Sequence, residues 1–307
     1  MRYLVIICMV ALTTNGCRQD SRNIRTVDFS EGVSADGTEN TFSGKAPLKV
    51  AVSAMSSPRE TFSTYEDIIR YIAARLDVPF EFHQRRTYIE VNNMLETGQL
   101  DFAFICSGAY VELNRDTGVE LLSVPVTRGN TVYQAYVIVP ENSPAQEFGD
   151  LKGTSFAYTD LLSNTGYLYT LFRIMEKGEN PDTFFSSTVF TNAHDVSIQM
   201  VAKGLIDGAS VHGMIFEYLR ENKPDRIRGV RIIEKSEDYG IPPVVASSRM
   251  DDDLIASVRD VFEGMHLDEH GRQLINRLLI ERFIEGNDSD YNGIRAMRSA
   301  LEDRIRE

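Results

Sequence analysis

LKVAVS, at residues 48–53, and TYEDIIRYIAARL, at residues 64–76, together decide the fold class. The first segment is short and apolar, which is typical of a buried strand, and the second repeats apolar residues at helical spacing. Thr64 stands at the start of the periodic run and Asp67 follows in its first turn, so we expect the helix to begin near Thr64. A strand that leads into an amphipathic helix is the repeating unit of α/β proteins.

The same alternation continues along the chain. Further strands are predicted at residues 79–82, 101–105, 154–158, 188–190 and 209–211. Further helices are predicted at residues 88–96, 165–177, 193–203, 251–266, 271–284 and 290–305. Alternation of this kind indicates mostly parallel sheets that are flanked by helices.

Two extended stretches are predicted to cross between two lobes. One is TVYQAYVIVP at residues 131–140, and the other runs from VRIIE at 230–234 towards residues 241–243. Lobe 1 would then comprise residues 47–135 plus 241–307, and lobe 2 residues 136–240. We therefore expect an α/β protein with two lobes and a two-strand hinge. Its ligand would lie in the cleft, at the carboxyl ends of strands and the amino ends of helices.

The N-terminus has the pattern of a secretory signal. Arg2 precedes an apolar run at residues 3–12, which is too short to span a bilayer. Gly16 and Cys17 follow, as at a lipoprotein processing site, so we predict a signal peptide at residues 1–16 and a lipid on Cys17. Ordinary secretion and a buried N-terminal strand are the alternatives. Residues 18–46 are polar and lack periodicity, which indicates a flexible tether.

Composition limits the class of partner. The chain has 307 residues, of which 42% are hydrophobic and 25% charged, and a formal net charge of −13. This charge argues against nucleic acid as a partner, because nucleic acid requires a basic face. It does not exclude a small anion, which a few local dipoles can hold. Beyond Cys8 and Cys17 the chain has a single cysteine, Cys106, which we interpret as a small buried hydrophobe.

DLLSNTGY, at residues 160–167, is the strongest local signal for a binding site. It separates a predicted strand from a predicted helix. Ser163, Asn164 and Thr165 would present side chains and free backbone N–H groups at the helix N-terminus, where the helix dipole favours an anion. Gly166 would let a ligand approach the backbone closely. The alternative is that the segment is an ordinary helix cap.

Several segments in this order resemble the phosphonate/phosphite periplasmic binding proteins of ABC importers. The turn at Ser163 is similar to that family's Ser-Thr-Ser-Gly ligand loop. The other matching segments are SSPRE at 56–60, DFAFI at 101–105, SGAYV at 107–111, His194 with KGLIDGA at 203–209, and YGIPPVV at 239–245. The resemblance covers about residues 47–285 and implies a two-lobe periplasmic-binding-protein (Venus flytrap) fold.

The resemblance also implies which residues face the cleft and which partners the protein has. The implied ligand-binding residues are Tyr65, Tyr110, Ser163, Asn164, Thr165, Gly166, His194 and His212. The implied ligand is a small oxyanion of the phosphonate, phosphite or phosphate type, and the implied partner is an ABC permease in the membrane. His212 and Gly213 stand where some relatives carry an acidic residue for a ligand amine, which argues against an aminophosphonate.

Two other functions are compatible with parts of the sequence. A binding protein of the same fold could report its ligand to a membrane histidine kinase. A hydrolase could use Cys106 or Ser163 with His194 or His212, although neither lies in a nucleophile-elbow motif. His266 and His270 are four residues apart, but a solvated helix face explains this spacing better than a metal site. We expect no enzyme activity, catalytic residue, metal or cofactor, and a monomer located on the periplasmic or extracellular face of the membrane.

We predict that Cys17 carries the lipid that anchors the protein. In detergent phase partitioning, the wild-type protein should enter the detergent phase and the Cys17→Ser variant should remain in the aqueous phase. Cys8→Ser, which alters a residue of the predicted signal peptide, is the matched control and should behave as wild type. Recovery of wild type and Cys17→Ser in the same phase would contradict the assignment.

Overall fold

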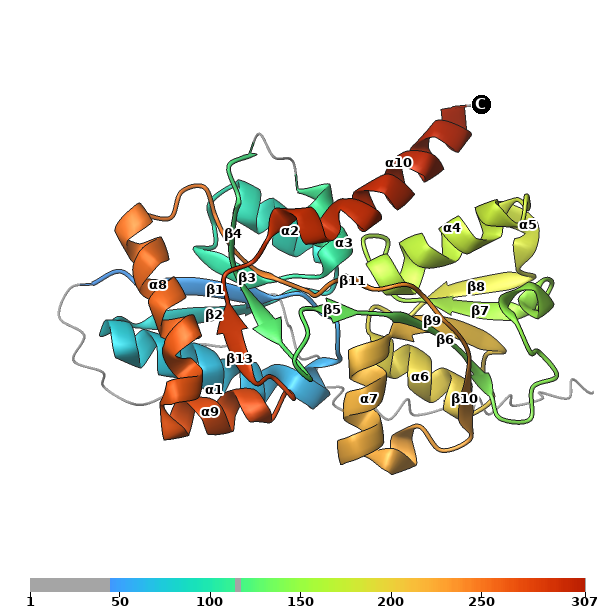
Figure 1. Ribbon diagram of the computed structural model, residues 1–307, viewed down its shortest axis with the longest axis horizontal. Helices are drawn as coiled ribbons and strands as arrows, with labels where there is room; N and C mark the ends of the chain where they lie inside the picture. The colour runs from blue at the N-terminus through green and yellow to red at the C-terminus, as the bar shows by residue number, and fades with distance from the viewer. Residues whose placement is uncertain (1–44, 114–116, 307) are drawn as a thin grey trace, which may run out of the picture. The chain divides into compact units, whose positions relative to one another are not determined.

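The computed structural model describes residues 45–113 and 117–306, and these form two larger sheets, each with its own helices (Figure 1). The predicted signal peptide, Cys17 and nearly all of the predicted tether lie outside the described residues. The first sheet has the order β13-β4-β12-β3-β1-β2. Its strands are β1 (Leu48–Val52), β2 (Phe80–Gln84), β3 (Phe102–Phe104), β4 (Glu120–Val126), β12 (Val244–Ala246) and β13 (Arg282–Ile284).

The second sheet has the order β10-β6-β9-β7-β8. Its strands are β6 (Ala135–Pro140), β7 (Ser155–Tyr158), β8 (Ser187–Phe190), β9 (Gly208–His212) and β10 (Val230–Lys235). We call the first sheet with its helices lobe 1 and the second sheet with its helices lobe 2. The predicted α/β class is confirmed, but the expectation of mostly parallel sheets is wrong, because the strands next to the crossings run antiparallel to their neighbours and both sheets are mixed. β1 pairs in parallel with β2 and β3, and β7 pairs in parallel with β8 and β9, whereas β12, β13 and β6 pair antiparallel with their neighbours.

The helices of lobe 1 are α1 (Pro58–Leu76), α2 (Tyr88–Glu96), α3 (Ser107–Glu112), α8 (Asp252–Gly264), η5 (Met265–Leu267) and α9 (Glu269–Asn276). Those of lobe 2 are η2 (Phe148–Leu151), η3 (Asn164–Leu168), α4 (Tyr169–Glu176), α5 (Pro181–Phe184), α6 (His194–Ala202), α7 (Gly213–Asn222) and η4 (Pro224–Arg226). The chain ends with η6 (Asp288–Tyr291) and α10 (Asn292–Arg306). Among the described residues, no helix combines the length and the apolarity that a membrane span requires.

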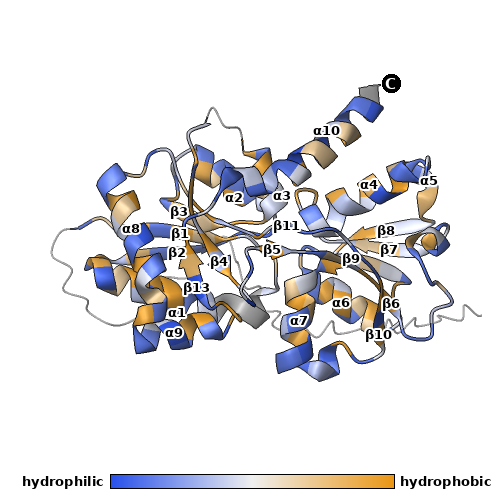
Figure 2. Cartoon of the chain, in the orientation of Figure 1, coloured by the Kyte–Doolittle hydropathy of each residue, from blue (hydrophilic) through white to orange (hydrophobic). Residues whose placement is uncertain are grey.

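α1 shows how the apolar stripe of a helix forms the core. Ile68, Ile69 and Ile72 are fully buried in the core of lobe 1, and apolar residues concentrate on the strands and on the inner helix faces (Figure 2). The predicted start at Thr64 is wrong, because Pro58 occupies the first turn and α1 begins there. The helix stops at Asp77, which adopts a left-handed conformation with φ 52°.

Two short strands connect the lobes. β5 (Val132–Tyr133) pairs antiparallel with β11 (Tyr239–Gly240), and Tyr133 lies opposite Tyr239. Both strands belong to the stretches that the sequence identified as crossings. Since β6 directly follows β5 and β12 follows β11, each crossing leads from one large sheet to the other. The domain boundaries derived from the sequence remain a prediction.

The C-terminal region differs from the sequence-based expectation. The predicted helix at 271–284 is wrong in its second half, because α9 ends at Asn276 and Leu279 adopts a left-handed φ of 60°. The chain then reverses, and Arg282–Ile284 forms strand β13 beside β4. His266 and His270 also lie in different helices, η5 and α9, so the assumption that they share one helix face is wrong.

α10 contacts both lobes. Ile294 and Met297 are buried in the main core of lobe 2. Arg298 forms an ion pair with Glu112 of α3 in lobe 1, and the Arg304 side chain donates to the carbonyl oxygen of Met175 in α4 at 3.4 Å. The C-terminal helix is therefore fastened to both sides of the hinge.

Candidate functional site

The turn after β7 places Ser163 at the start of η3. The Asp160 carboxylate accepts from the backbone N–H of Leu162 at 2.9 Å, which shapes the turn. Ser163 then caps η3, because its Oγ accepts from the N–H of Gly166 at 3.0 Å. The segment is therefore a helix cap, as the simpler interpretation proposed. Capping uses one acceptor site of Ser163 and leaves Asn164 and Thr165 free for other contacts.

A fully buried histidine, His194, contacts this turn through a hydrogen bond to Ser163. His194 is the first residue of α6, and its Nδ1 lies 3.2 Å from the backbone nitrogen of His212. A backbone N–H can only donate, so Nδ1 is the acceptor and the neutral ring carries its proton on Nε2. Nε2 lies 3.4 Å from the Ser163 Oγ, so the ring directs its N–H at that oxygen. Burial lowers the pKa of His194 to about 3, so the ring is uncharged at neutral pH.

Two tyrosines lie against the same turn, Tyr88 of lobe 1 and Tyr133 of hinge strand β5. The Tyr133 hydroxyl accepts from Asn164 Nδ2 at 3.1 Å and also lies beside Ser107 and Thr165. The Tyr88 hydroxyl lies near Ser163. Burial raises the pKa of both tyrosines, so their hydroxyls remain protonated. Thr165 Oγ1 and Asn164 Oδ1 are buried without a normal hydrogen-bond partner among the described residues.

Cys106 lies within this polar group. It is the N-cap residue of α3 and is fully buried. Burial raises the pKa of its thiol, although the backbone N–H groups of Asn164, Gly108 and Ala109 lie close to the sulfur and oppose that shift. The thiol therefore remains protonated and packs against Tyr88 and Ala109.

Two carboxylates of lobe 2 accept hydrogen bonds from the N-termini of two helices of lobe 1. Asp195 accepts from the backbone N–H and the hydroxyl of Ser57, the N-cap of α1, at 2.7 and 2.6 Å. Asp160 accepts from the backbone N–H of Tyr88, the first residue of α2, at 3.1 Å. Each carboxylate satisfies an N–H group that has no partner within its own helix. The backbone N–H of His194 also donates to the Met55 carbonyl at 3.0 Å, so the two lobes are joined directly.

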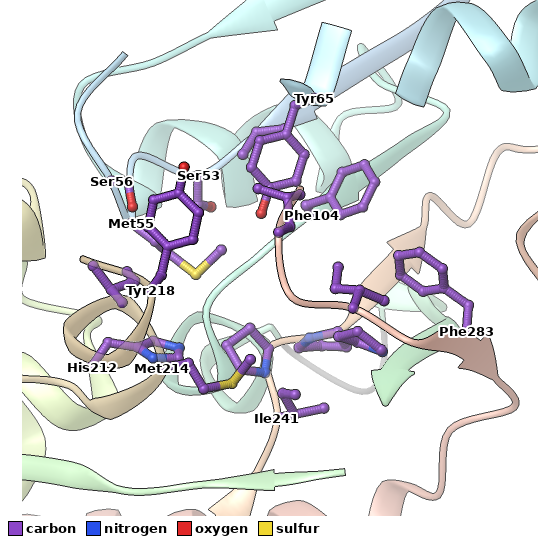
Figure 3. Close-up of a pocket in the computed structure, with 17 residues that line it drawn as sticks. Ser53, Met55, Ser56, Tyr65, Phe104, His212, Met214, Tyr218, Ile241 and Phe283 are labelled. Atoms are coloured by element: carbon purple, nitrogen blue, oxygen red, sulfur yellow. The ribbon is translucent and has the colours of Figure 1, made fainter. Parts of the chain in front are cut away.

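A cavity of about 110 Å³ lies beside these contacts (Figure 3). Its lobe 1 wall includes Tyr65 and Phe104, and its lobe 2 wall includes His212 and Met214. The Tyr65 ring packs edge-on against Phe104 with a centroid distance of 5.0 Å. Burial raises the pKa of Tyr65 to about 12, so its hydroxyl stays protonated and can donate. The His212 ring lies against Tyr133, with centroids 4.3 Å apart, so it borders both the cavity and the hinge tyrosine beside the turn at Ser163.

The residues that the sequence singled out fall into three groups. Ser163, Asn164, Thr165, Gly166 and His194 form the buried turn and its support. Tyr65 and His212 line the cavity. Tyr110 belongs to neither group, because its hydroxyl donates to Asp288 at 2.8 Å and its ring packs on Tyr291.

The expected role of Gly166 also requires correction. A Cβ at this position would lie 2.4 Å from Thr159 Oγ1 and 2.9 Å from His194 Cε1. Gly166 is therefore required for close packing of the turn against its own lobe, and the space beside it is filled by protein. The expectation that it opens the backbone to a ligand is wrong.

Sequence reasoning missed several residues of the site. Tyr88, Tyr133 and Ser53 were not singled out. Tyr88 begins a helix and Tyr133 lies in a hinge strand. In the sequence, a role in folding explains each of them as well as a role in binding does. Only the pairing of β5 with β11 and the contact between the lobes bring them to the turn.

Comparison with known proteins gives a consistent family and fold. A family model described as the periplasmic substrate-binding protein of phosphonate ABC transporters matches residues 50–291. The fold is similar to that of a binding protein component of an ABC phosphonate transporter from Pseudomonas aeruginosa, with a TM-score of 0.76 and 20% identity over 84% of this chain and 87% of that one. It is also similar to PhnD1 from Prochlorococcus marinus, solved with methylphosphonate, with a TM-score of 0.75 and 17% identity over 83% of this chain and 98% of that one.

We predict that His194 makes stability depend on pH. Its pKa is about 3 in the folded protein and about 6.5 when unfolded, so its contribution to stability is complete above pH 6.5 and is lost as pH falls towards 3. Between pH 6 and 4.5 the free energy of unfolding of wild type should fall by about 1.4 kcal/mol per pH unit more than that of His194→Gln. Denaturant unfolding at each pH measures this difference. The exposed His270→Gln serves as control and should keep the wild-type slope, whereas equal slopes for wild type and His194→Gln would refute the assignment.

Proposed function

Since the chain belongs to the family of phosphonate periplasmic substrate-binding proteins of ABC transporters, we propose that it captures a small phosphonate-type oxyanion between its lobes and delivers it to a membrane permease. The observation that carries this proposal is the cavity that both lobes line. Ser53 Oγ and His212 Nδ1 belong to its lining residues, and both atoms are buried without a hydrogen-bond partner in the described part of the chain. Neutral donors of this kind can hold an anion inside a protein of net charge −13.

The turn at Ser163 supports the same proposal. Ser163 Oγ accepts from Gly166 and faces the N–H of His194, so its own hydroxyl hydrogen can be donated to the nearby Tyr88 hydroxyl or to a bound oxyanion. Thr165 Oγ1 is buried and lacks a normal partner among the described residues. Hydrogen bonds from such groups are strongest when the acceptor is charged. We propose that Ser163, Asn164, Thr165 and His212 contact the oxyanion, that Tyr65 closes over its organic part, and that His194 positions Ser163 without touching the ligand.

Closure of the lobes is the proposed mechanism. The contacts of Asp195 with Ser57 and of Asp160 with Tyr88 exist only while the lobes are together. A ligand that contacts both lobes favours the closed state by its differential affinity for that state. The paired strands β5 and β11 connect the lobes and are the proposed hinge.

The geometry disfavours the hydrolase alternative. A serine nucleophile requires a histidine nitrogen that can accept its proton. The His194 nitrogen that faces Ser163 already carries a proton, and the His194 pKa of about 3 leaves the ring a weak base. Cys106 has a raised pKa, which is opposite to the shift that activates a thiol.

The proposed location follows from the family and from the N-terminal sequence. A periplasmic binding family implies an extracytoplasmic protein. We further propose that a lipid on Cys17 holds the protein at the membrane as a lipoprotein, where the permease would be close. We also propose that the ligand-loaded unit is a monomer.

Thr165 provides a test of the anion site that separates binding from folding. Thr165→Val removes a hydroxyl that makes no normal hydrogen bond and lies beside the Tyr133 hydroxyl, so stability should fall less than in Ser163→Ala, but affinity for methylphosphonate should fall about ten- to hundredfold. Ser163→Ala should lower both affinity and stability, the latter by about 1 kcal/mol, because Ser163 also caps η3. Calorimetric titration and thermal melting measure the two effects.

Thr170→Val is the matched control for this test. Thr170 Oγ1 is likewise buried without a partner in the described residues, but it lies further along the same segment, in α4. This variant should keep wild-type affinity. Wild-type affinity in Thr165→Val would show that the turn is a cap only and that the ligand lies elsewhere.

Gly108 provides a test of closure. A Cβ at Gly108 in lobe 1 would lie 2.3 Å from the Leu162 carbonyl and 2.7 Å from the Asn164 nitrogen in lobe 2. Gly108→Ala should therefore hinder closure, weaken methylphosphonate binding roughly tenfold or more, and reduce the ligand-induced decrease in radius of gyration. Small-angle scattering measures that decrease. Gly264→Ala is the control, since a Cβ there meets no described atom within 4 Å, and equal behaviour of both variants would argue against the clamp.

A further inference from the structure

The lining of the cavity restricts the kind of ligand it can take. On the lobe 1 side lie Val52, Met55, Phe104, Pro125, Leu278, Ile280 and Phe283, and on the lobe 2 side lie Met214 and Ile215. Ile241, Pro242 and Pro243, which follow hinge strand β11, complete the apolar wall. Side chains from both lobes point into the same space, with Tyr65 and Phe104 across it from His212 and Met214 (Figure 3).

The polar atoms of the lining are few and uncharged. They come from Ser53, Ser56, Tyr65, His212 and Tyr218. Burial and the neighbouring His194 lower the pKa of His212 well below its usual value, so its ring is neutral. None of the described residues that line the cavity is an Asp, Glu, Lys or Arg. An ammonium group placed here would lose its hydration without gaining a carboxylate partner from this lining.

The cavity lies beside the proposed anion site. Met55 and Ile215 line the cavity and also contact the cluster of Tyr88, Cys106 and Ala109 beside the turn. His212 lies on the cavity wall and packs its ring on Tyr133, whose hydroxyl accepts from Asn164. A ligand with its oxyanion near His212 would therefore direct its organic group into the apolar space.

We propose that the ligand of this site is a phosphonate with an uncharged, apolar organic group of several carbon atoms. This inference rests on the proposed function and specifies its substrate class. The cavity volume of about 110 Å³ is several times the roughly 10–15 Å³ that one water molecule requires. Methylphosphonate leaves most of this apolar space unused, and an aminoalkyl phosphonate brings a charge that the described lining does not match.

A series of n-alkylphosphonates tests the proposal by calorimetric titration of the wild-type protein. From methyl through ethyl and propyl to butyl, the dissociation constant should fall by about fourfold per methylene until the cavity is filled. The decisive comparison is n-propylphosphonate with 2-aminoethylphosphonate, which have chains of the same length and differ by one methyl in place of an ammonium. The propyl compound should bind at least about tenfold more tightly.

Met214→Glu tests whether the lining sets this preference. Met214 is half-buried on the lobe 2 wall, and a carboxylate there should shift the ratio of propyl to aminoethyl affinity about tenfold or more towards the amine. Met200→Glu makes the same change at a half-buried residue of lobe 2 that packs on its core outside the cavity, and it should keep the wild-type ratio. Thermal melting confirms that each variant is folded, and the wild-type series remains decisive if Met214→Glu does not fold.

The possible outcomes separate this inference from the function on which it rests. If methylphosphonate binds but longer chains gain nothing, or if the aminoethyl compound equals or exceeds the propyl compound, the apolar-ligand inference is overturned and the phosphonate function stands. If no phosphonate of the series binds, the phosphonate function fails, and the inference fails with it. A fall in the dissociation constant with chain length, together with rejection of the amine, supports both.

Discussion

The contact between the lobes depends on backbone N–H groups at helix N-termini, which need hydrogen-bond acceptors. α1 and α2 of lobe 1 point their first N–H groups at lobe 2, and buried N–H groups must be hydrogen-bonded. Asp195 and Asp160 supply the oxygens, so two carboxylates of lobe 2 complete two helices of lobe 1. The positions of His194 and of the turn at Ser163 follow from this arrangement, because His194 precedes Asp195 and the turn directly follows Asp160.

Burial sets the charge state throughout the site. His194 and His212 are neutral because no described carboxylate offsets the cost of charging them. Burial also raises the pKa of the Cys106 thiol and of the nearby tyrosines, so these groups keep their protons. The site therefore offers oriented N–H and O–H dipoles and no formal positive charge among the groups described at it. Such a site suits the binding and release of an anion, because its interactions are directional and moderate.

Much of the fold could be predicted from the sequence, because strands and helices of α/β proteins have different apolar periods. The periodic residues of α1, the crossings at β5 and β11 and the turn at Ser163 are local patterns. Tyr110 could not be placed, because its contact with Asp288 joins residues far apart in the chain. The reversal at Leu279 and the close packing around Gly166 were likewise missed, because each depends on partners that only the folded chain brings together.

The attachment of α10 to both lobes has a consequence for how a closed molecule could be recognised. Its buried residues belong to the core of lobe 2, while Arg298 pairs with Glu112 of lobe 1. A helix attached on both sides of a hinge has to bend, slide or detach from one side when the hinge rotates. If the lobes close on a ligand as proposed, the state of the enclosed site would be transmitted to this outer helix. A membrane partner that touched only α10 would then distinguish an occupied molecule from an unoccupied one without contact with the cargo.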